Sequence, residues 1–164
     1  MKHLSMIAAV GNNLELGYQN QLLCRLPVDL KRFKEVTSGC TVIMGDRTWE
    51  SLPKKPLPKR RNIVLTLDPK LVFENCEMAY SIDELMNMLQ EDENAFIIGG
   101  ATIYKLFIDK IDKLYLTRIL SDFTADVYFP DFDVSKWNLV EDEFLGKDEI
   151  NLHDLRFQVY ELKK

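Results

Sequence analysis

One acidic side chain, Asp29, is predicted to lie on the apolar face of a helix, where a charge is unusual. The helix predicted over residues 27–36 carries an apolar stripe of Leu30, Phe33 and Val36, and Asp29 falls within that stripe. Four charged neighbours are predicted on the opposite side of this helix: Lys31, Arg32, Lys34 and Glu35. A carboxylate that faces an apolar interior is costly unless it is hydrogen-bonded. It could stabilise the start of the helix, or it could accept two parallel N–H bonds from an amino-pyrimidine or guanidinium-like ligand edge.

Two glycine-containing turns could hold a phosphate. Gly99-Gly100 separates a predicted strand from a predicted helix, and Gly45 does the same ahead of Arg47 and Thr48. Backbone N–H groups at helix starts favour an anion, so two such starts on neighbouring strands could grip one pyrophosphate. Packing alone also explains a Gly-Gly turn. Neither turn has the G-x-G-x-x-G or Walker pattern, so an ordinary Rossmann or P-loop assignment is not supported.

A basic segment, residues 54–61, stands out in a chain whose net charge is -5. It could be a solvated loop or a chance cluster that resembles a nuclear-localisation signal. Its prolines stiffen it, which favours positioned charges. A fixed arginine there could present its fork to a carboxylate or phosphate of a ligand.

Composition favours one small cytoplasmic domain, residues 1–164. A hydrophobic content of 46% can form a sizeable core. The negative charge argues against a nucleic-acid partner, and no apolar run reaches membrane-spanning length. The three cysteines are odd in number and widely spaced, which is typical of reduced thiols, and two histidines exclude a histidine-rich metal centre. No coiled-coil signal is present, so we expect a monomer and no metal.

Strand-like and helix-like segments alternate along the chain. Short apolar runs predict strands over residues 4–10, 40–44, 62–67, 95–98 and 113–120. Helices are predicted over residues 27–36, 47–52, 82–89 and 101–108, with Pro27 as a first helical residue and Ser81 as an N-cap. Such alternation predicts an α/β fold with a mostly parallel sheet between helices. Residues 137–144 and 155–162 alternate as half-exposed strands do, which predicts a C-terminal antiparallel hairpin.

Taken together, these segments resemble dihydrofolate reductase over essentially the whole chain. The matching pieces, in order, are SMIAA at 5–9, LG at 16–17 with Asn20, LPVDL at 26–30 with Phe33 and Lys34, VIMG at 42–45 with TWES at 48–51, PLP at 56–58 with RRNIVLT at 60–66, IIGGA at 97–101 with Tyr104, LYLT at 114–117, and Asp126 with Phe129-Pro130. The order and spacing of these pieces make chance an inadequate explanation.

The resemblance implies a fold, a reaction and partners. The family fold is a three-layer arrangement in which four helices flank a central, mainly parallel eight-stranded sheet. The implied reaction reduces 7,8-dihydrofolate to tetrahydrofolate with hydride from NADPH, in one-carbon metabolism. Dihydrofolate and antifolate inhibitors such as trimethoprim and methotrexate are the implied partners.

The resemblance also implies site residues. The catalytic residues would be Asp29, Thr117 and Leu22. Asp29 would bind the 2-amino group and N3 of the pterin, Thr117 would be its hydrogen-bond partner, and Leu22 would belong to the loop over the nicotinamide. The substrate cleft would be formed by Ile7, Ala9, Asp29, Leu30, Phe33, Leu52, Leu57, Arg60, Ile98 and Tyr104, with Arg60 holding the glutamate carboxylate. The cofactor site would be formed by Ala9, Leu16, Gly17, Gly45, Asp46, Arg47, Thr48, Leu65, Thr66, Leu67, Ile98, Gly99, Gly100, Ala101, Thr102, Ile103, Tyr104 and Asp126. The Gly99-Gly100 bond would be cis, and residues 17–23 would form a mobile loop over the nicotinamide.

Cys24 is the first departure from the family pattern, because a tryptophan is usual there. The absence of this tryptophan would open space beside the pterin and remove an indole N–H, so altered antifolate binding is expected. Two rival functions remain: a pyrimidine reductase of riboflavin synthesis with the same fold, and a non-catalytic protein that binds folates or antifolates. The pair Asp29 and Thr117 argues against the first of these.

Asp46 is the second departure, since the family commonly has an arginine that reaches the 2'-phosphate of NADPH. Leu67 likewise replaces a frequent hydrogen-bonding residue. An acid near a dianionic phosphate is repulsive, although salt and exposure reduce the effect. We still expect NADPH rather than NADH, because Arg47, Thr66 and Lys70 remain nearby.

Overall fold

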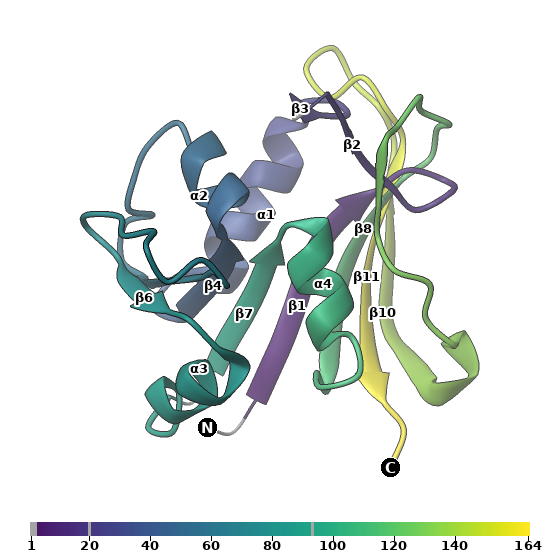
Figure 1. Cartoon of the computed structure of the whole chain (residues 1–164). Coiled ribbons are helices and arrows are strands. Elements are labelled where there is room, and N and C mark those ends of the chain that lie inside the picture. The colour runs from purple at the N-terminus through teal and green to yellow at the C-terminus, as the bar shows by residue number, and fades with distance from the viewer. Residues whose placement is uncertain (1–2, 20, 93) are drawn as a thin grey trace.

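An eight-stranded sheet forms the centre of the computed structural model, which describes residues 3–19, 21–92 and 94–164 (Figure 1). The strand order is β10-β11-β8-β1-β7-β4-β5-β6. The strands are β1 (His3–Val10), β4 (Thr41–Gly45), β5 (Arg61–Leu65), β6 (Glu77–Ala79), β7 (Asn94–Gly99), β8 (Lys113–Ile119), β10 (Trp137–Leu145) and β11 (Leu155–Leu162). The strands β8, β1, β7, β4, β5 and β6 run parallel, while β11 is antiparallel to β8 and to β10. The predicted mostly parallel sheet with a C-terminal hairpin is therefore confirmed.

Helices cover both faces of this sheet, as the alternation predicted. They are α1 (Pro27–Thr37), α2 (Asp46–Ser51), α3 (Ile82–Met88) and α4 (Ala101–Phe107), and a short 3-10 helix spans Val134–Lys136. Leu85 of α3 and Phe107 of α4 are buried in one core cluster, and Trp49 of α2 is buried in a second cluster that includes Phe33 of α1. α1 and α2 thus lie against one face, and α3 and α4 against the other (Figure 1).

Buried parallel strands contribute to both clusters at once. Along β1, Met6 and Ala8 belong to the cluster under α3 and α4, whereas Ile7 belongs to the cluster under α1 and α2. Successive side chains of a strand point to opposite faces, so a strand covered on both sides must be apolar at nearly every position. This explains why the continuous apolar runs identified the central strands.

Local signals also placed the helix starts. Pro27 is the first residue of α1, where its missing N–H costs nothing. The backbone N–H of Glu84 donates to the Ser81 hydroxyl at 3.0 Å, so Ser81 caps α3 as predicted. The three cysteine thiols are free. None of the helices among the described residues is long and apolar enough to cross a bilayer.

A second, three-stranded sheet was not predicted. It consists of β2 (Glu15–Tyr18), β3 (Gln21–Leu22) and β9 (Val127–Tyr128), in the order β3-β2-β9. The segment expected to be a loop, residues 17–23, therefore includes an antiparallel pairing of β2 with β3. Strands of two to four residues have too little periodicity to be recognised, which also explains the missed strand β6. Asn20, quoted above among the matching residues, lies outside the described residues.

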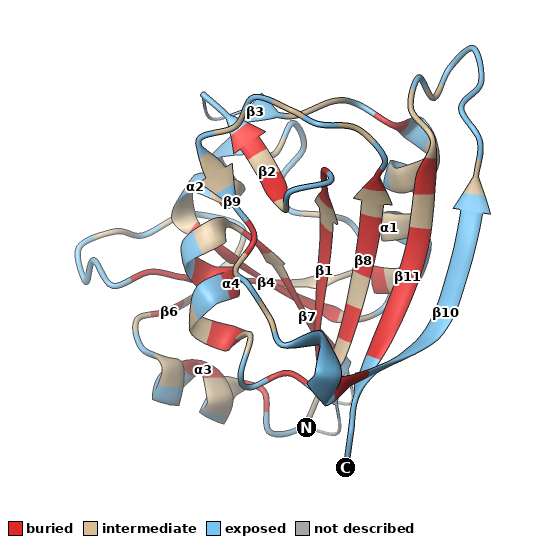
Figure 2. Cartoon of the chain, turned by 90° about the vertical axis from the view of Figure 1, so that its right-hand side faces the viewer, coloured by how far each residue is buried: buried red, intermediate tan, exposed pale blue. Residues whose placement is uncertain are grey.

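The prediction of half-exposed alternation in the hairpin was wrong for β10. Only Trp137 of this strand is buried, and its apolar residues Leu139, Val140 and Phe144 are all exposed, so one face is not covered as half-exposed alternation predicted. β10 is one of the two edge strands of the central sheet and, within the described residues, pairs with β11 alone. It stands at the margin of the molecule, with exposed residues along nearly its whole length (Figure 2). In β11, by contrast, Leu155, Phe157 and Val159 are buried.

Candidate active site

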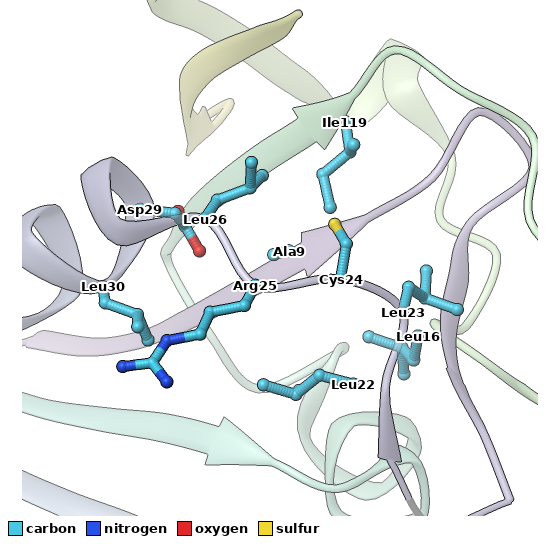
Figure 3. A pocket seen from close by; sticks show the side chains of 10 residues that line it. All are labelled: Ala9, Leu16, Leu22, Leu23, Cys24, Arg25, Leu26, Asp29, Leu30 and Ile119. Carbon is cyan, nitrogen blue, oxygen red and sulfur yellow. The ribbon is translucent and has the colours of Figure 1, made fainter. Parts of the chain in front are cut away.

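Asp29 is the central residue of the cleft, and it lies in the first turn of α1. The Thr117 hydroxyl, from the buried strand β8, donates to Asp29 Oδ1 at 2.6 Å. Figure 3 shows the carboxylate pointing into the cavity between α1 and β1. Within residues 3–19, 21–92 and 94–164, Asp29 forms no ion pair. A second carboxylate oxygen is thus available to a ligand.

Burial is the main influence on this acid. It raises the pKa of Asp29 above the ordinary aspartate value, because the charged form loses solvation. The Thr117 hydrogen bond and, more weakly, the charge of Arg32 lower the pKa in opposition. The geometry therefore supports a ligand-facing carboxylate as well as a helix-start acid.

Arg32 differs from the prediction that all charged residues of α1 face away from Asp29. Its side chain is half-buried, and its guanidinium carbon lies 4.5 Å from the centre of the Phe157 ring on β11. The ring attracts the cation and holds it close to the sheet. The Arg32 charge therefore acts on Asp29 electrostatically without an ion pair.

The cavity beside Asp29 is mostly apolar. Its lining includes five residues named from the sequence as site residues: Ala9, Leu16, Leu22, Asp29 and Leu30. Cys24, named as a departure, also lines it, and burial together with the Asp29 charge raises the pKa of its thiol. Three lining residues were not named as site residues, namely Arg25, Leu26 and Ile119, and Leu23 was placed at the site only as the end of the predicted loop 17–23. Leu26 extends the apolar stripe of α1, which could have identified it, whereas Arg25 and Ile119 carry no such signal.

Other predicted substrate residues pack behind this cavity rather than lining it. Ile7 is buried in the cluster under α1 and α2, and four further residues pack against that cluster: Phe33, Leu52, Leu57 and Ile98. These five residues, called here the apolar wall, belong to the packing between the sheet, α1, α2 and the loop that carries Leu57.

Arg60 is held in a defined position at the end of this wall. Its Nη1 donates to the Thr37 hydroxyl at 3.1 Å, and its Nε donates to the Pro58 carbonyl at 2.9 Å. Its guanidinium carbon lies 5.8 Å from the centre of the Phe33 ring. The neighbouring Arg61 is used differently, because it forms ion pairs with Glu77 and Asp92. Of this arginine pair, Arg60 alone faces the cleft wall.

Tyr104 joins the two central strands below the cleft. Its hydroxyl lies 2.8 Å from the carbonyl oxygen of Ile7 and 2.9 Å from that of Ile98. Full burial raises its pKa strongly, and the nearby charge of Asp29 adds to the effect. A hydroxyl held in this way positions β1 against β7.

The predicted cofactor residues gather at the carboxyl ends of the adjacent strands β5, β4 and β7. Gly45 ends β4, and Gly99 ends β7 in a cis bond to Gly100, as expected. A Cβ at Gly45 would lie 3.0 Å from Ile103 Cγ1, and one at Gly99 would lie 3.3 Å from the Thr48 hydroxyl. A side chain at Gly99 would crowd Thr48 and one at Gly45 would crowd Ile103, so glycine keeps this backbone approachable. The remaining residues of this edge are Asp46, Arg47, Leu65, Thr66, Ala101 and Thr102.

Thr66 is less free than the sequence suggested. Its hydroxyl donates to Asp46 Oδ2 at 3.2 Å and accepts the backbone N–H of Asp68 at 3.2 Å. Leu67 is 76% exposed and contributes no polar group. Arg47 is exposed at the start of α2. Thr66 is therefore hydrogen-bonded to Asp46. Arg47 remains as an exposed basic residue next to Asp46 that could offset its negative charge.

Gly17 and Asp126 join the small sheet to the cleft. The backbone N–H of Asp126 donates to the Gly17 carbonyl at 3.0 Å, and Asp126 Oδ2 accepts the backbone N–H of Gln19 at 3.0 Å. A Cβ at Gly17 would lie 2.8 Å from the Gln21 carbonyl oxygen, so this tight turn requires glycine. These contacts hold β2, which also carries Leu16, beside the cavity.

The fold and the cleft define a small α/β enzyme, with an acid in an apolar cavity and a glycine-lined edge next to it. The sequence model of dihydrofolate reductase matches residues 3–162. The chain is 41% identical to the dihydrofolate reductase of Bacillus subtilis, over 98% of this chain and 95% of the relative. It is 38% identical to the type 3 dihydrofolate reductase of Salmonella typhimurium, over 94% of each chain.

A solved structure agrees with these relatives. The dihydrofolate reductase from Enterococcus faecalis, complexed with NADP(H) and RAB-propyl, superposes with a TM-score of 0.92 at 33% identity, over 99% of this chain and 97% of that one. The chain belongs to the dihydrofolate reductase family.

Proposed function

We propose that this chain reduces 7,8-dihydrofolate to 5,6,7,8-tetrahydrofolate with NADPH as the hydride donor, and so serves one-carbon metabolism. The observation that carries the proposal is the Asp29 carboxylate, which faces an apolar cavity and is held by Thr117 at 2.6 Å. The family assignment gives the reaction, and the Enterococcus faecalis relative was solved with NADP(H).

Asp29 is proposed to bind the amino-pyrimidine edge of the pterin. An ionised carboxylate can accept two parallel N–H bonds, and each charge-assisted bond contributes about 1.5–3 kcal/mol. Arg60, fixed by Thr37 and Pro58, is proposed to hold the glutamate carboxylate at the far end of the wall. The apolar wall between them fits the flat rings that join these two polar ends.

The residues at the strand ends fit a dinucleotide. Gly99 and Gly100 leave backbone open along Thr48, Gly45 leaves it open beside Ile103, and α2 and α4 begin there without side-chain caps of their own. We propose that Gly45, Arg47, Thr48 and the segment 99–102 bind the cofactor phosphates. When bound, NADPH supplies the hydride that reduces the pterin.

The protein residues orient the reactants and exclude water. Asp29 grips the edge of the pterin that lies away from N5, so it does not hand a proton to N5 directly, and solvent is the proposed proton source. Its charge favours a cationic pterin in a cleft of low polarity. Leu22 and Leu16 cover the reacting region, and positioning of this kind accounts for much of the catalysis.

Asp46 makes the choice of cofactor an experimental question. The carboxylate accepts the Thr66 hydroxyl and repels a 2'-phosphate, whereas Arg47 attracts it. We propose a preference for NADPH. Measured kcat/KM values for NADPH and NADH test this preference, and a higher value for NADH would overturn it.

Turnover of dihydrofolate is the test of the proposed function. The reduced cofactor loses its near-ultraviolet absorbance when it is oxidised, so the rate is followed directly. We expect Asp29→Asn to abolish turnover, because the amide cannot accept both pterin N–H bonds. Asp109→Asn, at an exposed position beyond α4, is the matched control and should keep wild-type turnover. Binding of dihydrofolate without turnover by the wild-type chain would instead indicate a folate-binding protein.

We also propose that the chain acts as a cytoplasmic monomer in one domain, residues 1–164, and that antifolate inhibitors occupy the same cavity. The one-domain proposal is supported by the central eight-stranded sheet, against which all four helices pack core residues. Light scattering with size-exclusion chromatography tests the monomer, and a dimer mass would contradict it.

A further inference from the structure

The helix that carries Asp29 begins without a capping side chain of its own. The N-cap residue of α1 is Leu26, which has no polar side-chain atom. Pro27 has no N–H, and the backbone N–H groups of Asp29 and Leu30 both donate to the Leu26 carbonyl, at 3.0 and 3.1 Å. Among the first four helical residues, 27–30, which are all described, only Val28 has an N–H without a local acceptor. A free N–H at a helix start must find a partner elsewhere or remain solvated.

The missing acceptor comes from a distant loop. The backbone N–H of Val28 donates to Asn151 Oδ1 at 3.0 Å, across 123 residues of sequence. Asn151 belongs to the segment between β10 and β11, residues 146–154. An asparagine amide oxygen is among the best capping acceptors for a helix start, although it normally comes from the N-cap position itself.

Asn151 is itself held in place. Asp148 Oδ1 accepts the backbone N–H groups of Ile150 at 2.8 Å and of Asn151 at 2.6 Å. The Asp148 N–H donates back to the Asn151 carbonyl at 2.8 Å. These bonds close a tight turn that presents the Asn151 side chain outward toward α1. The Asn151 Nδ2 also donates to both Asp148 carboxylate oxygens at 3.4 Å, but the three shorter backbone bonds do not involve the side chain, so a substitution there can remove the cap and leave the turn.

We infer that Asn151 is a positioning residue for Asp29 and acts through the first turn of α1. This inference rests on the proposed function of Asp29. Val28 directly precedes Asp29, so the bond from Asn151 fixes the backbone next to the carboxylate that faces the cavity. Thr117, on β8, fixes the carboxylate itself, at 2.6 Å. The acid is thus located between a strand and a loop that both lie far from α1 in the sequence.

The consequence is selective for one substrate. Loosening the first turn moves the carboxylate that binds dihydrofolate, while the cofactor residues lie at the ends of β4, β5 and β7. A purely structural cap would lower stability without changing one KM relative to the other. Loss of a positioning cap raises the KM for dihydrofolate and leaves the KM for NADPH unchanged.

Three variants test the inference by steady-state kinetics. We expect Asn151→Ala to raise the KM for dihydrofolate about 5-fold, the factor that corresponds to a typical capping loss of ~1 kcal/mol. The KM of this variant for NADPH should stay within about 2-fold of the wild-type value. Asn138→Ala, on the exposed edge strand β10, is the matched control and should change neither constant. The exchanged pair Asp148→Asn with Asn151→Asp keeps one charge and an acceptor at each position, and should restore the KM for dihydrofolate.

Amide hydrogen exchange at Val28 gives a second readout that does not depend on turnover. We expect faster exchange in Asn151→Ala and wild-type exchange in the exchanged pair. Unchanged KM for dihydrofolate together with faster exchange would overturn the inference, because the cap would then be structural only. Unchanged exchange would overturn it as well. A wild-type chain without dihydrofolate turnover would overturn the proposed function instead, and the exchange experiment distinguishes that failure from a failure of the cap.

Discussion

Replacing Thr117 with valine removes one hydrogen bond and almost nothing else. The hydroxyl donates to Asp29 Oδ1 at 2.6 Å, and the side chain is 4% exposed on β8. Valine has nearly the shape of threonine, so the packing around β8 should be preserved. The variant thus isolates the contribution of this bond to the carboxylate.

The magnitude follows from the geometry. A short bond to a charged acceptor contributes about 1.5–3 kcal/mol, which corresponds to a loss of about 10- to 150-fold in kcat/KM. Water can replace the hydroxyl in a cavity that opens to solvent, so we expect a value near the lower end, about 10-fold. Because the hydrogen bond lowers the pKa of Asp29 against the raising effect of burial, its removal raises that pKa further.

The assay is the pH dependence of kcat/KM for dihydrofolate, which reports ionisations of the free enzyme. We expect the ionisation assigned to Asp29 to move to higher pH in Thr117→Val. Thr41→Val is the matched control, because Thr41 is also buried and its hydroxyl donates to Asp92 Oδ2 at the same 2.6 Å. Thr41 lies at the opposite end of β4 from Gly45, so it should cost similar stability and leave the pH profile unchanged.

Coincident pH profiles for Thr117→Val and wild type would refute the reasoning. So would an equal displacement in Thr41→Val, because the effect would then arise from lost stability rather than from Asp29. Thermal unfolding of both variants separates these cases, since a loss of 1 kcal/mol lowers Tm by roughly 2–4 °C in a chain of this size.

Three further results are expected. At a pH above the raised pKa of Asp29, Asp29→Asn should stabilise the fold by about 0.5–2 kcal/mol, because the desolvated charge is gone. This gain, measured as Tm, should vanish at a pH below the ordinary aspartate pKa, because the wild-type acid is then protonated and uncharged. Glu15→Gln should lower the free energy of unfolding in urea by about 1–3 kcal/mol, because both carboxylate oxygens of buried Glu15 accept backbone N–H groups and glutamine has one such oxygen. The control Glu143→Gln, at an exposed position, should leave the free energy of unfolding unchanged. Cys24→Trp should change the trimethoprim inhibition constant by about 3- to 10-fold, since an indole adds aromatic contact in the cavity; equal constants would contradict this.

The sequence predicted the parts of the fold that repeat a pattern. Buried parallel strands are continuous apolar runs, and helix starts at Pro27 and Ser81 use local chemistry, so both were found. The three-stranded sheet was missed, because β3 and β9 contain two residues each and are defined by their partners. The exposure of β10 was also mispredicted, since alternation describes a strand's own residues and does not reveal that no element covers them.

The site was predictable where a residue type was unusual for its position. Asp29 is an acid within an apolar stripe, and Gly99-Gly100 separates a predicted strand from a predicted helix, so the sequence alone identified both as candidate site residues. Arg25 and Ile119 line the cavity through tertiary placement alone. Arg32 was placed on the wrong side because its interaction with Phe157 joins α1 to β11, and no local pattern encodes that contact.

The position of Asp29 depends on more of the chain than its neighbours in sequence. Burial disfavours its charge, yet the proposed reaction needs that charge, so the fold must supply compensating groups without neutralising the acid. An adjacent lysine would neutralise it and occupy the oxygen that the pterin needs. A hydroxyl from β8, an arginine held at a distance by Phe157, and a backbone cap from Asn151 each stabilise the site while leaving one carboxylate oxygen open. All three contacts bring distant segments to α1, so we expect substitutions at Thr117, Phe157 or Asn151 to alter the affinity of the cleft for dihydrofolate.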